Sequence, residues 1–90
     1  MTTFWLSFSS KTGFLGVVIV EAPTLAHAVT AAHRAKCNPG GSVASMQITD
    51  EIREIAEPAD LAKFDALPRL KLMSRTELIE RGIEIEPVYT

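Results

Sequence analysis

The sequence has little cysteine and little net charge, and each shortage excludes a class of protein. Cys37 is the only cysteine among the 90 residues, so no disulfide bond can form within the chain. Nine basic and eleven acidic side chains give a net charge of −2, so no strong field draws the whole molecule toward nucleic acid or anionic lipid. We therefore expect a protein of the reducing cytoplasm that binds neither nucleic acid nor a membrane.

Long apolar segments are lacking as well. The longest, residues 14–20, is far too short to cross a bilayer and is followed at once by Glu21. The first residues do not show the basic region of a secretory signal peptide. Both observations agree with the expected cytoplasmic location.

What the sequence does contain is typical of a small folded domain. Apolar residues make up 47% of the chain and charged residues 22%, and a chain of this length forms one domain with a thin core. Residues 1–45 hold three basic side chains and one acidic one, whereas residues 46–90 hold six basic and ten acidic ones. We interpret the first half as a sheet with a packed helix and the second half as solvated helical surface.

Two strand patterns occupy the first 20 residues. Thr3–Ser9 alternates in hydropathy, so its apolar side chains share one face, and these are Phe4, Leu6 and Phe8. Phe14–Val20 is apolar on both faces, which is typical of a strand that is covered on both sides. The polar residues between the two strands predict a hairpin with a positive φ at Gly13. Gly16 predicts a bulge or a close approach by another element.

A helix and a third strand follow. Thr24 is the expected N-cap and Pro39 cannot continue a helix, so we expect one long helix that ends before Asn38. Pro39 and Gly40 fit the centre of a type II turn that leads into a strand at Val43–Thr49. A strand–helix–strand crossover predicts that this third strand runs parallel to the second, either paired with it or placed beyond the first. We favour the order second, first, third.

The second half of the sequence predicts short helices. Asp50 can cap one that runs through Ile52 and Ile55 and ends near Glu57 and Pro58, and Pro58–Leu67 forms the next. A capping box at residues 74–77 begins a further helix, which stops at Gly82.

These patterns define a single small α+β domain over residues 1–90. Residues 1–49 form a ββαβ core with a three-stranded mixed sheet and one long helix, and residues 50–82 form short C-terminal helices. Residues 83–90 are either an edge strand or a mobile tail.

His33 and Cys37 are the first candidates for chemistry because they lie four residues apart and so share one helix face. As metal ligands they are too few, since a structural zinc site takes four ligands and a catalytic one usually three. As a nucleophile Cys37 is poorly placed, because the C-terminal end of a helix dipole disfavours a thiolate. We therefore expect no metal, no cofactor and no catalytic residue, and an enzyme is the least favoured class.

The loop that follows, Cys37–Ser42, offers free backbone N–H groups that could hold an anion. Phosphate-binding loops usually precede a helix, whereas this one follows a helix, so a turn is the simpler interpretation. A small-ligand or anion site here is the alternative function. Its residues are His33, Cys37, Asn38, Gly40, Gly41 and Ser42.

Trp5 points away from the apolar face of the first strand, on the same side as Ser7 and Ser9. A tryptophan at this position is either covered by the C-terminal helices or exposed as the anchor of an interface. So short a chain has few residues to cover both faces of a sheet, and exposed apolar surface marks partner sites. We therefore expect a homodimer or another protein partner.

Four segments of the first half carry a resemblance. They resemble a group of small bacterial and phage-associated proteins that have no assigned activity. The segments are Trp5–Phe8, Phe14–Val17 and Ile19–Ala22 before the helix, and Cys37–Gly41 after it. This sequence departs from the group by a shorter first loop and by Ser42 in place of an acidic residue. The resemblance implies an architecture and no chemistry, while a phage or mobile-element accessory role is an analogy based on size.

The function expected from the sequence is that of a non-enzymatic interaction or regulatory accessory protein. It would act through an exposed sheet edge or through the face that carries Trp5. The alternative is the small-ligand or anion site of residues 37–42.

Overall fold

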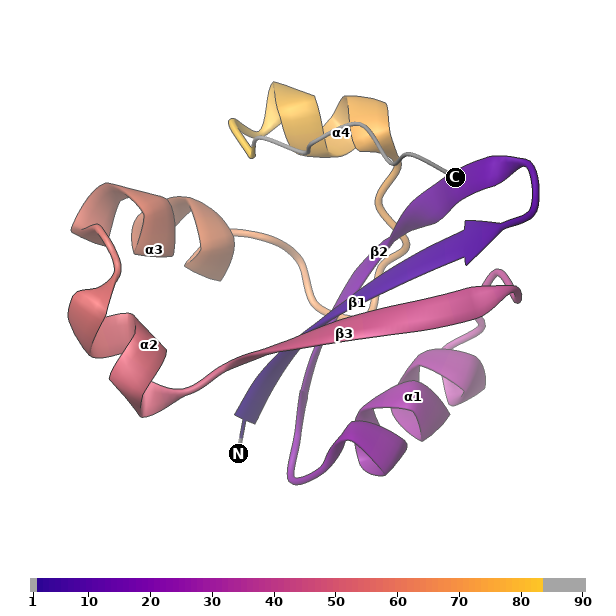
Figure 1. Ribbon diagram of the computed structural model, residues 1–90, viewed down its shortest axis with the longest axis horizontal. Helices are drawn as coiled ribbons and strands as arrows, with labels where there is room; N and C mark the ends of the chain where they lie inside the picture. The colour runs from indigo at the N-terminus through magenta and orange to yellow at the C-terminus, as the bar shows by residue number, and fades with distance from the viewer. Residues whose placement is uncertain (1, 84–90) are drawn as a thin grey trace.

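The computed structural model describes residues 2–83, and its centre is a three-stranded sheet (Figure 1). β1 (Thr2–Ser10) pairs with β2 (Gly13–Ala22) on one side and with β3 (Ser42–Ile48) on the other, so the order is β2-β1-β3. The α+β class and the favoured strand order are confirmed, whereas the mixed sheet is wrong. β2 and β3 run in the same direction, but β1 lies between them, and both strand pairs are antiparallel.

The hairpin of β1 and β2 contains a β-bulge. Phe8 pairs with Gly16. Ser9 pairs with Phe14, which leaves Leu15 without a partner on β1. The bulge that the glycine predicted is therefore present, and it increases the local twist of the hairpin.

Gly16 also lies against the chain that returns past β2, so the predicted close approach is present too. Its φ is 149°, and a Cβ at this position would lie 2.7 Å from Leu72 Cδ1 and 2.9 Å from the carbonyl oxygen of Met73. A side chain larger than hydrogen would push the returning segment away from the sheet. The turn of the hairpin likewise has the predicted positive φ, 135°, at Gly13.

α1 (Leu25–Arg34) has ten residues, so the helix is shorter than the long one expected from the sequence. Thr24 caps its N-terminus as predicted, and its hydroxyl oxygen accepts the N–H of His27 at 3.2 Å. His27 occupies the position where a capping box has a carboxylate, and its ring Nδ1 lies 2.6 Å from the same Thr24 hydroxyl.

The end of α1 explains its length. Lys36 adopts a left-handed conformation with φ of 59°, so the helix stops before Pro39 is reached. The Lys36 N–H donates to the carbonyl of His33 at 3.0 Å. The Cys37 N–H donates to the carbonyl of Ala32 at 3.1 Å, which completes a Schellman motif. The helix therefore ends at its C-cap, Ala35, four residues ahead of the proline.

Three short helices follow the sheet: α2 (Asp50–Ile55), α3 (Pro58–Asp65) and α4 (Arg75–Glu80). Thr49 caps α2 instead of Asp50, because the extended backbone that an N-cap needs falls at Thr49 and Asp50 is already helical. None of the helices in residues 2–83 has the length and apolar character that crossing a membrane requires. The tail expected at residues 83–90 lies, beyond Ile83, outside the described residues.

The capping box predicted at the start of α4 is only half formed. The Ser74 hydroxyl accepts the N–H of Glu77 at 3.2 Å. The Glu77 carboxylate instead binds Lys71 at 2.9 Å and Arg81 at 3.2 Å. Two cations near the carboxylate therefore replace the backbone N–H that a complete box would offer.

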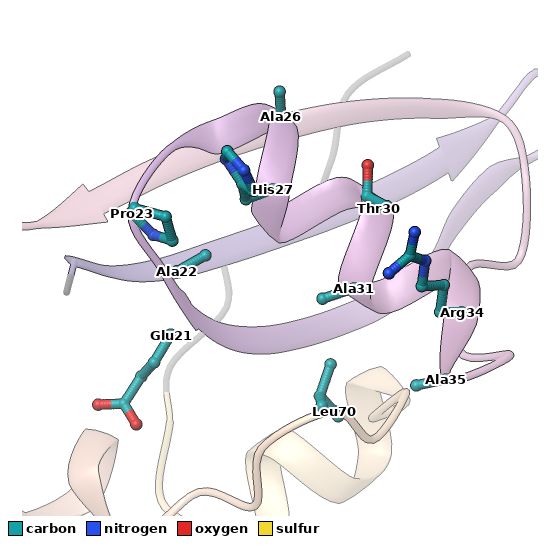
Figure 2. Close-up of a pocket in the computed structure, with 10 residues that line it drawn as sticks. All are labelled: Glu21, Ala22, Pro23, Ala26, His27, Thr30, Ala31, Arg34, Ala35 and Leu70. Atoms are coloured by element: carbon teal, nitrogen blue, oxygen red, sulfur yellow. The ribbon is translucent and has the colours of Figure 1, made fainter.

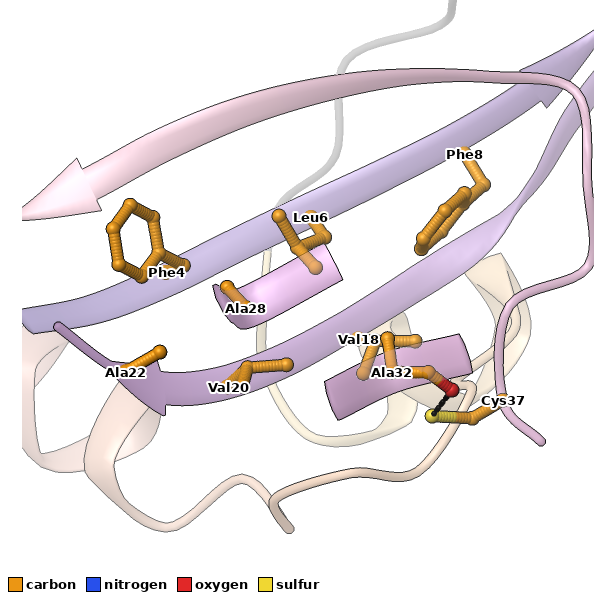
Figure 3. Close-up of a cluster of buried hydrophobic side chains, with 9 residues drawn as sticks. All are labelled: Phe4, Leu6, Phe8, Val18, Val20, Ala22, Ala28, Ala32 and Cys37. Atoms are coloured by element: carbon orange, nitrogen blue, oxygen red, sulfur yellow. Dashed lines mark hydrogen bonds between the residues drawn. The ribbon is translucent and has the colours of Figure 1, made fainter. Parts of the chain in front are cut away.

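The sheet is covered on both faces, by α1 on one and by α3 and α4 on the other (Figure 1). Under α1 the buried side chains are Phe4, Leu6, Phe8, Val18, Val20, Ala22, Ala28, Ala32 and Cys37 (Figure 3). On the opposite face they are Val17, Ile19, Ile48, Phe64, Leu67, Met73 and Leu78. The face predicted from the alternation of β1 is confirmed. β3 contributes Ile48 alone to these two clusters and so lies at their margin.

Candidate interaction surface

The two edges of the sheet differ in what covers them. Along the outer edge of β2, Val17 and Met73 exchange two backbone hydrogen bonds, of 2.9 and 2.8 Å. The Leu70 N–H adds a third by donating to the carbonyl of Ile19 at 2.9 Å. The segment at residues 70–73 therefore closes this edge.

The outer edge of β3 has no such cover. Within residues 2–83 this strand pairs with β1 alone, and six of its seven residues are exposed. Ser42–Ile48 carries neither a charged side chain nor a proline, which are the usual devices that protect an open edge. As far as the described residues show, a row of backbone N–H and C=O groups on this edge is thus left for another strand.

The side chains of β3 alternate between the two faces of the sheet. Val43 lies opposite Phe8, so it is on the α1 face, but α1 does not extend over it and 42% of the residue is exposed. Met46 lies opposite Trp5 on the other face and is 48% exposed. Figure 3 shows the cluster under α1, to which β3 contributes no side chain.

A groove lies on the Trp5 face beside β3, and we call it the Trp5 groove. Its volume is about 870 Å³. Its lining residues are Trp5, Met46, Ile48, Ile52, Ala56, Asp60, Leu61, Lys63, Phe64, Gly82 and Ile83. Most of these side chains are apolar, so the groove would accept apolar groups of a partner.

Trp5 is half-buried, and both environments expected for it are present in part. Its ring stacks on Phe64 of α3, with centroids 6.2 Å apart and planes 26° apart. The Arg69 guanidinium lies 5.9 Å from the centroid of the same Phe64 ring. One part of the indole is therefore held by α3, while another part lines the groove.

An ion pair holds the helices that form one wall of the groove. The Arg53 guanidinium of α2 donates to both carboxylate oxygens of Asp65 at the end of α3, each at 3.1 Å. This hydrogen bonding lowers the pKa of Asp65 below its ordinary value and raises that of Arg53. Arg53 also lies 3.5 Å from the Thr3 hydroxyl on β1. The pair connects α2, α3 and the sheet, although both side chains are partly exposed and screened by solvent.

Exposed apolar side chains extend the surface along α2. Ile52 lies on the wall of the groove, and Ile55 is 85% exposed. With Val43 and Met46 they place four large exposed apolar side chains within fourteen residues of chain that begin at Ser42. Other large apolar side chains are exposed elsewhere, but those lie singly on α1, α4 and the segment after α3.

Cys37 and His33 do not share an environment. The Cys37 residue is 8% exposed, its thiol donates to the carbonyl of Ala32 at 3.3 Å, and burial raises its pKa (Figure 3). His33 lies exposed on α1. In residues 2–83 no group of three or more histidine, cysteine, aspartate or glutamate side chains is arranged to hold a metal ion. The thiol thus fills the core as a small apolar group.

One backbone donor of the loop before β3 is satisfied within the loop. The Asn38 side-chain oxygen accepts the Gly40 N–H at 2.8 Å, which removes one donor from the predicted anion nest. Gly40 has φ of 88°, the positive value expected for the turn. Gly41 has φ of 74° and lies against the Ser9 carbonyl, which a Cβ would overlap. Ser42 then pairs with Ser9 and begins β3. The loop therefore positions the first residue of the open strand.

A second hollow of about 870 Å³ lies beside α1 (Figure 2). Leu70 projects toward α1 from the segment that closes the β2 edge, while Glu21 points away from the helix (Figure 2). Two of its polar side chains have partners within the chain, since His27 bonds to Thr24 and Glu21 lies 4.0 Å from Arg69. The hollow is a shallow surface feature, and it is less favoured than the edge of β3.

Sequence patterns indicated Trp5 but not Met46, Ile52 or Ile55. The signal that could have indicated this surface is the composition of Ser42–Ile48, a strand without charge or proline. Whether such a strand is central or at an edge depends on what pairs with it, which the pattern of one strand does not reveal.

Fold and surface together define a small α+β protein whose three-stranded antiparallel sheet has one closed edge and one open edge within residues 2–83. Comparisons with protein-family models, with curated proteins and with solved structures gave no match for this chain.

Proposed function

We propose that this protein is a non-enzymatic interaction or regulatory accessory protein that binds a partner protein along the open edge of β3. The observation that carries the proposal is the difference between the two sheet edges. Residues 70–73 close the edge of β2, whereas nothing else in residues 2–83 pairs with the outer edge of β3. An extended segment of a partner can add to such an edge as a further strand.

The Trp5 groove supports the proposal because it offers selectivity beyond backbone hydrogen bonds. Alternate side chains of an added strand point to the same face of the sheet. Those on the Trp5 side would lie over Met46 and reach the apolar wall formed by Ile48 and Phe64. A partner segment with apolar residues at alternate positions is therefore the best fit.

The environment of Cys37 supports a binding role over a catalytic one. Its thiol is buried and its pKa is raised, and both features oppose a nucleophilic thiolate. An accessory role in bacteria, phages or mobile elements rests on analogy with proteins of this size, and the cytoplasmic location rests on the single cysteine.

A strand peptide tests the proposal directly. The probe is a fluorescent peptide of alternating threonine and valine with the length of β3, and binding is measured by fluorescence anisotropy at a protein concentration where self-association is absent. Wild-type protein should bind the peptide. Met46→Lys should weaken binding by about tenfold, because the added charge lies on the open edge and in the groove.

Two controls make the result specific. Ile79→Lys changes an exposed apolar residue on α4, away from β3, and should bind the peptide as wild type does. The same peptide with all of its amides N-methylated keeps the side chains but lacks donors, and it should not bind. Equal binding by Met46→Lys, or no binding by wild type, would overturn the proposed function.

A further inference from the structure

We infer that the partner of β3 is a second copy of this chain, joined by antiparallel pairing of two β3 strands about a twofold axis that passes midway between the two copies of Ser45. The inference rests on the proposed function, because it names the partner of the same strand edge. Such an interface is isologous, and it would merge two sheets into one continuous sheet of six strands.

The register follows from the geometry of antiparallel pairs. Two residues that face each other across such a pair direct their side chains to the same face, so a strand can pair with its own copy only about a residue. Pairing about Ser45 uses the whole length of Ser42–Ile48, whereas any other centre leaves strand ends unpaired. Ala44 then lies opposite the partner's Met46, and Val43 opposite the partner's Gln47. A small residue thus faces a large one, and no like charges meet.

The charges around β3 favour the antiparallel arrangement. Basic side chains lie near the start of the strand, on the β1–β2 turn and at the end of α1, and these are Lys11, Arg34 and Lys36. Acidic side chains follow the end of the strand on α2, and these are Asp50, Glu51 and Glu54, while Arg53 of the same helix is paired with Asp65. Figure 1 shows that the hairpin turn and the end of α1 lie at one end of the sheet and α2 at the other. Antiparallel pairing brings the basic end of one copy to the acidic end of its partner, and a parallel pairing would bring like ends together.

The apolar side chains beside the edge supply further contact area. Two strands alone make a small interface, since specific interfaces usually bury at least ~1,200 Å² in total. Met46 borders the strand edge, and Ile52 and Ile55 follow on α2, where the last is almost fully exposed. In the twofold arrangement α2 would lie beside the loop that precedes β3 of the partner. The contact would remove these side chains from water, which favours association.

A charge exchange on the axis tests the inference. Ser45→Lys places two ammonium groups opposite each other only when a chain pairs with its own copy in this register, and Ser45→Glu does the same with two carboxylates. Sedimentation velocity from ~5 to ~200 µM should show that wild type dimerises. Each variant alone should associate at least about tenfold more weakly. An equal mixture of the two variants should recover the dimer, because opposite charges then meet on the axis.

Disulfide formation tests the register. Ser45→Cys places its thiol directly opposite that of the partner, whereas the two copies of Gln47→Cys would lie four residues apart, or about 13 Å. Under mild oxidation Ser45→Cys should form a covalent dimer at least about tenfold faster than Gln47→Cys, an order of magnitude that follows from their separations. Wild type serves as the blank, because Cys37 is buried in all three proteins.

The outcomes separate this inference from the proposed function. A wild-type chain that stays monomeric yet binds the strand peptide would overturn the second copy as partner and leave the open edge in place. A dimer that Ser45→Lys does not weaken, or equal rates for the two cysteine variants, would also overturn it. Failure of peptide binding as well as of dimerisation would remove both proposals.

Discussion

Val17 and Met73 exchange backbone hydrogen bonds of 2.9 and 2.8 Å, and this contact decides which edge of the sheet is open. The side chains of both residues are fully buried, so the returning segment is held by packing as well as by hydrogen bonds. The chain thereby supplies its own cover for β2. β3, on the far side of β1, receives no cover from residues 2–83. The asymmetry is the basis for both proposals.

Gly16→Ala should lower the free energy of unfolding by about 2–4 kcal/mol, because strain at positive φ adds to overpacking. The new Cβ would lie 2.7 Å from Leu72 Cδ1 and 2.9 Å from a backbone oxygen, which moves less readily. Gly13→Ala is the matched control, since Gly13 also has positive φ but has open space around it. We expect it to cost only about 1 kcal/mol. Urea unfolding of the two variants checks the difference, and similar losses would contradict the close approach.

Phe64→Ala should change the fluorescence of Trp5, the only tryptophan of the sequence. Removal of the stacked ring exposes the indole to water, so the emission maximum should move to longer wavelength. Because Phe64 is also buried, the variant should lose about 2–4 kcal/mol of unfolding free energy. Ile79→Ala, at an exposed position on α4, should change neither quantity. An unchanged emission maximum in Phe64→Ala would show that α3 does not cover Trp5.

The Cys37 thiol should react slowly with an alkylating reagent while the protein is folded. It is buried against α1, and its pKa is raised above the ordinary value, so little thiolate is present at neutral pH. Mass spectrometry should show rapid alkylation only in urea, where the chain is unfolded. An Ile79→Cys variant gives an exposed reference thiol on α4, away from β3. Equal rates for the two thiols would contradict the buried position.

Acid should lower the thermal stability of the protein, in part by protonating Glu77. Its pKa is lowered by the hydrogen bond from Lys71 and next by that from Arg81. Because the pKa of Glu77 is lowered in the folded protein, its carboxylate stabilises the fold fully at pH values above the ordinary pKa of 4.5. This stabilisation is lost as the pH falls through the pKa of the folded state. Thermal unfolding between pH ~6 and ~3 should therefore show a smaller acid-induced decrease for Glu77→Gln than for wild type.

Lys71→Met provides the check on the cause. It removes the first partner of the carboxylate, so a side-chain titration followed by NMR should report a higher pKa for Glu77 than in wild type. Arg75→Met removes a nearby cation that does not contribute to this shift, so the pKa of Glu77 should stay as in wild type. A Glu77 pKa that is insensitive to Lys71→Met would rule out this ion pair as the cause.

Local patterns in the sequence predicted much of the fold correctly. The alternation of β1 predicted the buried face of Phe4, Leu6 and Phe8, because side chains of a strand alternate with a period of two. Thr24 predicted the start of α1. Gly16 predicted the bulge and the close approach, since a missing Cβ is needed at both. Each of these signals depends on residues that are close in the sequence.

Other features were predicted incorrectly or not at all. The end of α1 depends on Lys36, which takes a left-handed conformation that its residue type does not announce, whereas Pro39 suggested a later stop. The mixed sheet was wrong because β1 separates the two strands that run in the same direction. The Trp5 groove was missed because its walls come from β1, β3, α2 and α3, and no pattern within one segment brings these together.

The sequence by itself determined the α+β class, the two apolar faces of the central hairpin and the loop that returns the chain into β3. These depend on side-chain periodicity and on the backbone preferences of proline and glycine, which act over a few residues. Only the tertiary structure decided that residues 70–73 cover β2 while β3 keeps an open edge within residues 2–83. That choice depends on hydrogen bonds between segments some fifty residues apart, as between Val17 and Met73, and a local pattern carries no information about such pairing.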